Sequence, residues 1–225
     1  MQPRFVGRLA LADVVTVVNA AVGFAAAAAA THSPSLAARL VLLGAIADGL
    51  DGVLARRYGS SPAGEFLDSL ADVATFAVAP AMLVFAVASG AWGLAADART
   101  AAAVGLPAAF VAVAVLRLGL YTADDVGNDH TVGVQSTLAA TLLAAGYLAG
   151  VTAPVALLAA TALFCYLMVA PVRYPDLYAR DALVLGGLQA LAVLFPTVVG
   201  GVFPRALLVA ALAYLLLSPR FYWRE

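Results

Sequence analysis

The chain has 225 residues, of which 64% are hydrophobic and 11% are charged, and its mean hydropathy is +0.98. Soluble domains contain roughly half apolar and about a quarter charged residues, so this composition excludes a soluble protein and predicts an integral membrane protein. The formal net charge of -1 excludes general binding to nucleic acid, which needs a basic face.

Apolar runs follow one another along the chain with short polar interruptions. A transmembrane helix needs about 20 predominantly apolar residues, and eight segments approach that length. They are expected at residues 11–30, 36–54, 66–88, 101–122, 134–150, 154–170, 183–199 and 203–217. Residues 1–225 are therefore predicted to form one all-α membrane domain of about eight transmembrane helices with short loops.

All 12 positive charges are arginines, and there is no lysine. With the N-terminus in the cytoplasm, eight spans leave three arginines outside, Arg39, Arg99 and Arg205. The other nine fall on the cytoplasmic side: Arg4, Arg8, Arg56, Arg57, Arg117, Arg173, Arg180, Arg220 and Arg224. Basic residues are in excess in cytoplasmic loops, so the protein is expected in the cytoplasmic membrane, with the turn after the second span facing the cytoplasm.

Five of the 13 acidic residues lie from Asp48 to Asp72, four of them in the second and third predicted spans and Glu65 just before the third. Asp48 and Asp51 are three residues apart, and Asp68 and Asp72 are four apart, so each pair lies on one helical face. A short turn makes the two helices antiparallel neighbours. The four carboxylates are therefore expected to converge between helices 2 and 3 near the cytoplasmic face.

Such a cluster needs positive charge, because a bare carboxylate in a membrane costs about 2.5 to 3.5 kcal/mol even on lenient scales. Hard divalent cations prefer oxygen ligands, and no Cys or His lies nearby, so Mg²⁺ or Mn²⁺ is expected, with two ions balancing the charge. Paired ions of this kind activate an attacking oxygen and stabilise a leaving phosphate. The alternatives are aspartates that cap helices in a scaffold, or the ligands of a metal-ion transporter.

The segments DGLDGVLAR and GEFLDSLAD, which begin at Asp48 and Gly64, together resemble the signature of the CDP-alcohol phosphatidyltransferases. The gap between them is one residue shorter than the family's usual form. The resemblance implies transfer of a phosphatidyl-type group from a CDP-linked lipid to an alcohol, with release of CMP. It further implies metal ligands at Asp48, Asp51, Asp68 and Asp72, a general base at Asp72, and CDP-lipid contacts at Asp51, Gly52, Ala55, Arg56 and Gly64.

Further stretches resemble the serine-transferring branch of that family. They are GEFLDSLADVATFAVAPA, GVQSTLAA, LMVAPVRYPDL and the TVVN of the first span. Thr75 and Ala77 stand where this branch more often has Ser and Gly, and Gln135 replaces a proline. The branch implies L-serine as acceptor; glycerol phosphate and inositol phosphate remain alternatives, although a phosphorylated acceptor would need a second basic cluster. The candidate serine contacts are Arg117, Ser136, Thr137 and Arg173.

The lipid donor is expected to be CDP-archaeol or CDP-diacylglycerol, with its chains in the membrane lipid. The lysine-free composition and loops such as TADDVGND favour a high-salt archaeal source, and hence CDP-archaeol. A homodimer is typical of the family and compatible with the many small residues of the chain.

Overall fold

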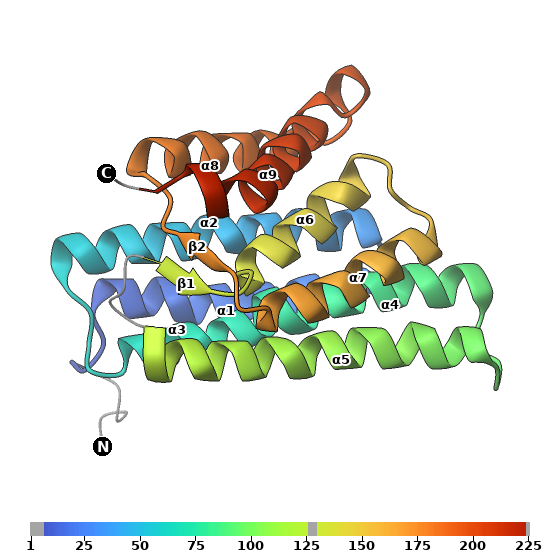
Figure 1. Ribbon diagram of the computed structural model, residues 1–225, viewed down its shortest axis with the longest axis horizontal. Helices are drawn as coiled ribbons and strands as arrows, with labels where there is room; N and C mark the ends of the chain where they lie inside the picture. Colours follow the sequence, from blue (N-terminus) through green and yellow to red (C-terminus); the bar gives the residue numbers. More distant parts are fainter. Residues whose placement is uncertain (1–6, 126–129, 224–225) are drawn as a thin grey trace.

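The computed structural model describes residues 7–125 and 130–223, and most of this part is helical (Figure 1). The α-helices are α1 (Leu11–Ala30), α2 (Pro34–Tyr58), α3 (Gly64–Asp72), α4 (Ala79–Trp92), α5 (Ala98–Leu120), α6 (Ser136–Leu148), α7 (Pro154–Val169), α8 (Ala179–Leu194) and α9 (Val202–Phe221). A π-helical segment, η1 (Val73–Val78), joins α3 to α4 without a break, a second one, η2 (Tyr121–Asp125), extends α5, and a 3-10 turn, η3 (Val198–Gly200), precedes α9. Arg4 and Arg224, which the predicted orientation uses, lie outside the described residues.

Within the described residues, four helices are long and apolar enough to cross a membrane. They are Leu11–Ala30, Gly64–Trp92, Ala98–Ala123 and Val198–Phe221. α6 and α7 are apolar but shorter. α2 has 25 residues but carries Asp48, Asp51 and three arginines. The chain is thus an integral membrane protein, and eight crossings remain a prediction.

The predicted spans lie within a few residues of the observed helices, with one larger difference at the seventh. The prediction continues this span to Val199, but α8 ends at Leu194. Phe195 precedes Pro196, and the residue before a proline disfavours the helical conformation. The apolar run therefore continues past the residue at which the helix stops.

Helices that follow one another in the chain, such as α1 and α2 or α8 and α9, pack as antiparallel neighbours (Figure 1). α1 lies along α2, while α8 and α9 pack on α2 and α6, respectively. The start of α1, the end of α9 and the turn between α2 and α3 all lie at the same end of the molecule (Figure 1). Large buried side chains such as Leu42, Phe76 and Phe110 fill the space between the helices. The aspartates of α2 and α3 are consequently held near one end of a packed bundle.

A short β-ribbon departs from the predicted all-α fold. Strand β1 (His130–Val132) pairs antiparallel with β2 (Arg173–Pro175), and Thr131 stands opposite Tyr174. The ribbon joins the segment after α5 to the segment after α7. It brings both connections together, with β1 against η2 and β2 against α9.

Polar contacts hold α8 at both of its ends. Near its C-terminus, the Arg39 Nε of α2 donates a hydrogen bond of 2.7 Å to the Val193 carbonyl. Near its N-terminus, the Tyr222 hydroxyl donates to the Asp181 carboxylate and accepts a 3.0 Å bond from the Tyr178 backbone N–H. Burial, followed by the bond to Asp181, raises the pKa of Tyr222, so the phenol keeps its proton at neutral pH.

Candidate active site

Three of the four predicted metal ligands meet at one point. Asp48 comes from α2, while Asp68 and Asp72 lie one turn apart on α3, and oxygens of the three carboxylates lie within 4.8 Å of one another. Asp72 is buried, and its Oδ1 atom has no hydrogen-bond partner within the described part of the chain. An unpaired buried carboxylate oxygen is costly, so this atom is suited to a ligand.

The fourth aspartate, Asp51, has a different partner. Its Oδ2 atom accepts a 2.7 Å hydrogen bond from the Thr16 hydroxyl of α1. Thr16 belongs to the TVVN segment, and a polar side chain in a span commonly bonds to a neighbouring helix in this way. Asp51 is therefore held next to the cluster of Asp48, Asp68 and Asp72, outside the closest group.

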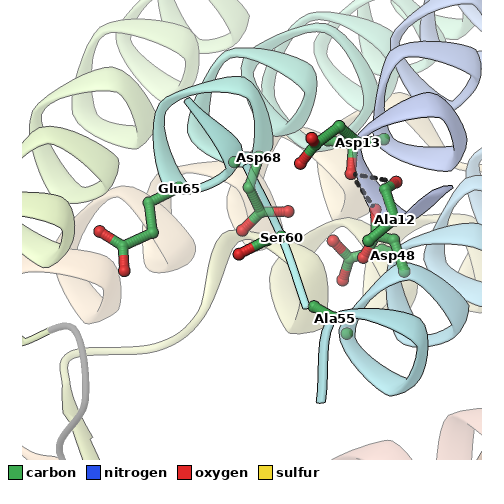
Figure 2. Close-up of a pocket in the computed structure, with 11 residues that line it drawn as sticks. Ala12, Asp13, Asp48, Ala55, Ser60, Glu65 and Asp68 are labelled. Carbon is green, nitrogen blue, oxygen red and sulfur yellow. Dashed lines mark hydrogen bonds between the residues drawn. The ribbon is translucent and has the colours of Figure 1, made fainter. Parts of the chain in front are cut away.

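A first cavity of about 290 Å³ opens between the starts of α1 and α3 and the end of α2 (Figure 2). Asp48 and Asp68 point into it, whereas the Glu65 carboxylate is directed away from them. Its lining is Ala12, Asp13, Thr16, Asp48, Asp51, Gly52, Ala55, Ser60, Gly64, Glu65 and Asp68. All of the predicted CDP-lipid residues except Arg56 thus line one space.

A glycine at position 64 lets the start of α3 approach the α2–α3 turn and α1 closely. A Cβ on Gly64 would lie 2.9 Å from the Ser60 Cβ and 3.0 Å from an Asp13 carboxylate oxygen, which is tighter than ordinary van der Waals contact. Arg56 is exposed, and its Nη1 lies 3.6 Å from the position that a Cβ on Gly52 would take. The arginine thus lies beside the cavity, near the glycine that follows Asp51.

The sequence prediction missed Asp13. Its carboxylate accepts hydrogen bonds from the backbone N–H of Ala10, at 2.7 Å, and of Ser61, at 3.2 Å. It therefore ties the first turn of α1 to the turn between α2 and α3. An acidic residue in a first helical turn is usual for the helix dipole alone, so the sequence holds no signal for the contact with Ser61.

A second, more polar cavity of about 170 Å³ lies on the other side of the cluster. Its lining is Asp48, Asp68, Ser69, Asp72, Arg117, Leu118, Tyr121, His130, Thr131, Gln135, Thr137 and Asp176. Arg117 is buried, and its Nη2 donates a 2.8 Å hydrogen bond to the Thr131 hydroxyl of β1. Two of the lining residues, His130 and Thr131, come from strand β1. The hydropathy pattern of the sequence did not predict that they lie in this cavity.

The four candidate serine residues do not all reach this second cavity. Arg117 and Thr137 line it. Ser136 is buried beside Thr137 but is absent from the lining, and Arg173 is exposed on β2.

The π-helical segment after Asp72 is tightly enclosed. The Thr75 hydroxyl donates a 2.9 Å hydrogen bond to the Asn19 carbonyl of α1. A Cβ on Gly23 would lie 2.7 Å from the backbone of Ala74 and Thr75, and a Cβ on Gly44 would overlap the Thr75 methyl group. These two glycines therefore allow η1 to pack closely against α1 and α2, one turn beyond Asp72.

Residues 9–172 match the sequence model of a protein family described as "CDP-alcohol phosphatidyltransferase". The chain belongs to this family. The match contains Asp48, Asp51, Asp68 and Asp72, together with Arg117, Ser136 and Thr137, and it stops one residue before Arg173. Membership of the CDP-alcohol phosphatidyltransferases favours a transferase over the transporter and scaffold alternatives.

Three relatives in this family carry curated names. The archaetidylserine synthase of Methanothermobacter thermautotrophicus is 29% identical over 171 residues, which is 74% of this chain and 70% of that protein. The CDP-diacylglycerol--serine O-phosphatidyltransferase of Mycobacterium leprae is 50% identical over 56 residues, 24% of this chain and 19% of that protein. The Saccharomyces cerevisiae protein of the same name is 41% identical over 88 residues, 35% of this chain and 32% of that protein.

The carboxylate cluster fits the metal dependence of the family. Its ligand atoms are all carboxylate oxygens, which hard divalent cations prefer. The buried Oδ1 of Asp72 lacks a protein partner in the described ranges, and a cation would supply one. Asp48, Asp68 and Asp72 are thus the residues that this structure offers to a metal ion.

Proposed function

We propose that the protein transfers an archaetidyl or phosphatidyl group from a CDP-linked lipid to the hydroxyl of L-serine, releasing CMP. The arrangement of the two cavities carries this proposal. Asp48 and Asp68 line both cavities, Asp51 lines only the first, and Asp72 lines only the second. A transferase that joins two substrates needs a donor site and an acceptor site on opposite sides of one reacting centre.

The first cavity is proposed to hold the cytidine diphosphate of the donor. Gly52, Ala55 and Gly64 leave room for a nucleotide close to the backbone. Asp51 also lines this cavity, and Arg56 lies beside Gly52, near enough to pair with a phosphate of the donor. The donor is proposed to be CDP-archaeol, because the archaetidylserine synthase match covers the largest share of the chain among the three relatives. CDP-diacylglycerol is the alternative donor.

The metal site is proposed to take two ions, Mg²⁺ or Mn²⁺, held by Asp48, Asp68 and Asp72 with Asp51 beside them. When bound, such ions offset the negative charge of the phosphates and make CMP a better leaving group.

Asp72 is proposed to be the general base. In the transfer, the serine oxygen forms a bond to the lipid-bearing phosphorus, the bond from this phosphorus to the CMP oxygen breaks, and the hydroxyl proton passes to the Asp72 carboxylate. Two observations support this role. Asp72 lines the second cavity, where the acceptor is proposed to bind, and does not line the first; its Oδ1 is buried without a partner in the described residues. A carboxylate within hydrogen-bond reach is a competent acceptor for such a proton.

The second cavity is proposed to bind serine, with Arg117 pairing with its carboxylate and Thr137 in reach of its polar groups. Among the described residues that line this cavity, Arg117 is the one arginine. A single arginine suits a single carboxylate better than a phosphorylated acceptor, which carries more negative charge. The assignment of Ser136 and Arg173 to serine binding rests on the family resemblance alone.

The active site is proposed to face the cytoplasm at headgroup depth. Arg56 and Arg57, which favour the cytoplasmic side, end α2 at the same end of the bundle as the first cavity. A single domain and a homodimer also remain predictions; cross-linking in native membranes tests the dimer.

The test is CMP release by the purified protein with Mg²⁺ or Mn²⁺. CDP-archaeol and CDP-diacylglycerol are each offered with serine, glycerol phosphate or inositol phosphate. Serine-dependent release of CMP is expected. Release with a phosphorylated acceptor alone would refute the serine assignment, and no release with any acceptor would refute the transferase.

A further inference from the structure

A third cavity, of about 220 Å³, lies between α2, α6, α8 and α9. Aliphatic and aromatic side chains form most of its wall, including Ala45, Leu138, Leu177, Ala182, Leu185 and Leu207. It shares Asp48, Gln135 and Thr137 with the second cavity. An occupant of this cavity would therefore have one end at the carboxylates and the rest in apolar surroundings.

Two polar side chains face each other inside this third cavity. The Gln189 Nε2 of α8 donates to the Thr141 hydroxyl of α6 at 3.5 Å, which is a long hydrogen bond. A carboxamide offers two N–H donors and an acceptor oxygen, so Gln189 has hydrogen-bonding capacity beyond this one contact. Polar groups at such a position in a membrane protein are costly and commonly serve a ligand.

We propose that this third cavity binds the glycerol end and the first methylenes of one chain of the CDP-linked lipid, and that Gln189, with Thr141, hydrogen-bonds to an oxygen of the linkage between that chain and glycerol, which is the carbonyl oxygen of an ester or the bridging oxygen of an ether. The proposal rests on the proposed function, since the lipid-bearing phosphorus must lie near Asp48. The glycerol and the first methylenes of the chain, which come after this phosphorus in the donor, then contact the apolar wall of the third cavity.

The linkage oxygen is the shared feature of ester lipids and ether lipids. An ester offers a carbonyl oxygen, which projects from the chain and is the stronger acceptor; an ether offers only the bridging oxygen. The Gln189–Thr141 pair therefore distinguishes the two donor classes, and its removal is expected to weaken an ester donor more than an ether donor.

The other cavities fit this role less well. The first is lined by several charged and polar side chains. An apolar groove between α4 and α5, lined by residues such as Val78, Phe85 and Val111, includes none of the aspartates of the cluster. Within the described residues, the third cavity is lined both by Asp48 and by a mostly apolar wall, as a site for the lipid part of the donor requires.

The first test compares Gln189→Leu with the wild type on ester-linked and ether-linked CDP-lipids of equal chain length, with serine and metal saturating. A fall in kcat/KM of about fivefold is expected with the ester donor, in line with the loss of one hydrogen bond. The fall should be smaller with the ether donor, and it should appear in KM with kcat unchanged. Equal kcat/KM for the variant and the wild type with both donors would overturn the proposal.

The second test fills the cavity from an exposed position, which avoids disturbing the core. Ala182 lines the cavity on the exposed side of α8, and Ala213 is exposed on α9 outside the lining, so Ala182→Leu and Ala213→Leu form a matched pair. Ala182→Leu is expected to raise KM several-fold for long-chain CDP-lipids but not for CDP-glycerol, while Ala213→Leu changes neither. An equal rise for CDP-glycerol, or no rise at all, would contradict lipid binding there.

Direct binding of the same donors without serine separates this proposal from the reaction itself. If the wild type releases no CMP with any acceptor, serine transfer fails. Weaker binding of ester CDP-lipid by Gln189→Leu then still supports the cavity, and unchanged binding refutes it.

Discussion

Gly44→Ala tests whether the enclosure of Thr75 positions Asp72. The added Cβ would overlap the Thr75 methyl group and lie 3.0 Å from the Asn19 Oδ1 atom, whereas carbon atoms prefer about 3.5 to 4.0 Å. The π-helical segment must therefore shift. Overpacking of this kind costs about 1 to 3 kcal/mol of stability, and a displacement of about 1 Å at a catalytic group lowers turnover on the order of 100-fold.

The assay for this variant combines thermal unfolding in detergent with the rate of CMP release at saturating substrates. Gly105→Ala is the matched control, because a Cβ there meets nothing within 4 Å. It should be neutral, or more stable by up to about 1 kcal/mol through helix propensity.

A second substitution makes this test sharper. Thr75→Ser removes the methyl group that Gly44→Ala overlaps but keeps the hydroxyl that bonds to Asn19. The double variant Gly44→Ala/Thr75→Ser should therefore recover much of the lost rate. Gly23→Ala clashes with the backbone of Ala74 and Thr75 at 2.7 Å, so Thr75→Ser should not rescue it. Full activity in Gly44→Ala, or equal rescue of both glycine variants, would refute the positioning role.

Three further predictions concern the site itself. Asp72→Asn should abolish turnover, because an amide accepts no proton from serine, while equilibrium binding of the CDP-lipid remains measurable. Arg117→Lys loses the planar fork and the bond to Thr131, and it should raise the KM for serine about tenfold, measured from serine saturation curves. Removal of divalent cations with a chelator should stop CMP release, and Mg²⁺ or Mn²⁺ should restore it in a titration.

Each of these predictions has a contradicting result. Near-normal turnover by Asp72→Asn would assign the base to another group. An Arg117→Lys variant with unchanged serine KM, or with weakened CDP-lipid binding instead, would remove Arg117 from the acceptor site. Full activity after exhaustive chelation would contradict the metal role of the carboxylate cluster.

Hydropathy was sufficient to predict the helices, because each needs only a continuous apolar run. It failed at the end of α8, where Pro196 stops the helix inside such a run, and at the β-ribbon, whose three-residue strands are too short to show a period of two. Local patterns predict elements best where the element is long.

Helical spacing also predicted the meeting of Asp48, Asp68 and Asp72, since two antiparallel helices suffice to bring them together. It could not separate Asp51 from them, because the Thr16 hydroxyl that holds Asp51 belongs to another helix. The contacts of Asp13, and the approach of Thr131 to Arg117, depend on loops brought together by the whole fold. Such contacts leave no trace in local spacing.

The contacts at the two ends of α8 bear on how this enzyme family changes during evolution. Arg39 fixes one end of the helix, and Tyr222 fixes the other. Between these two points Leu185 and Leu188 pack against the core, whereas Gln189 lines the third cavity. An exchange at Gln189 would leave both anchoring contacts of α8 in place, so the lipid recognition proposed above can change without a change at either end of the helix.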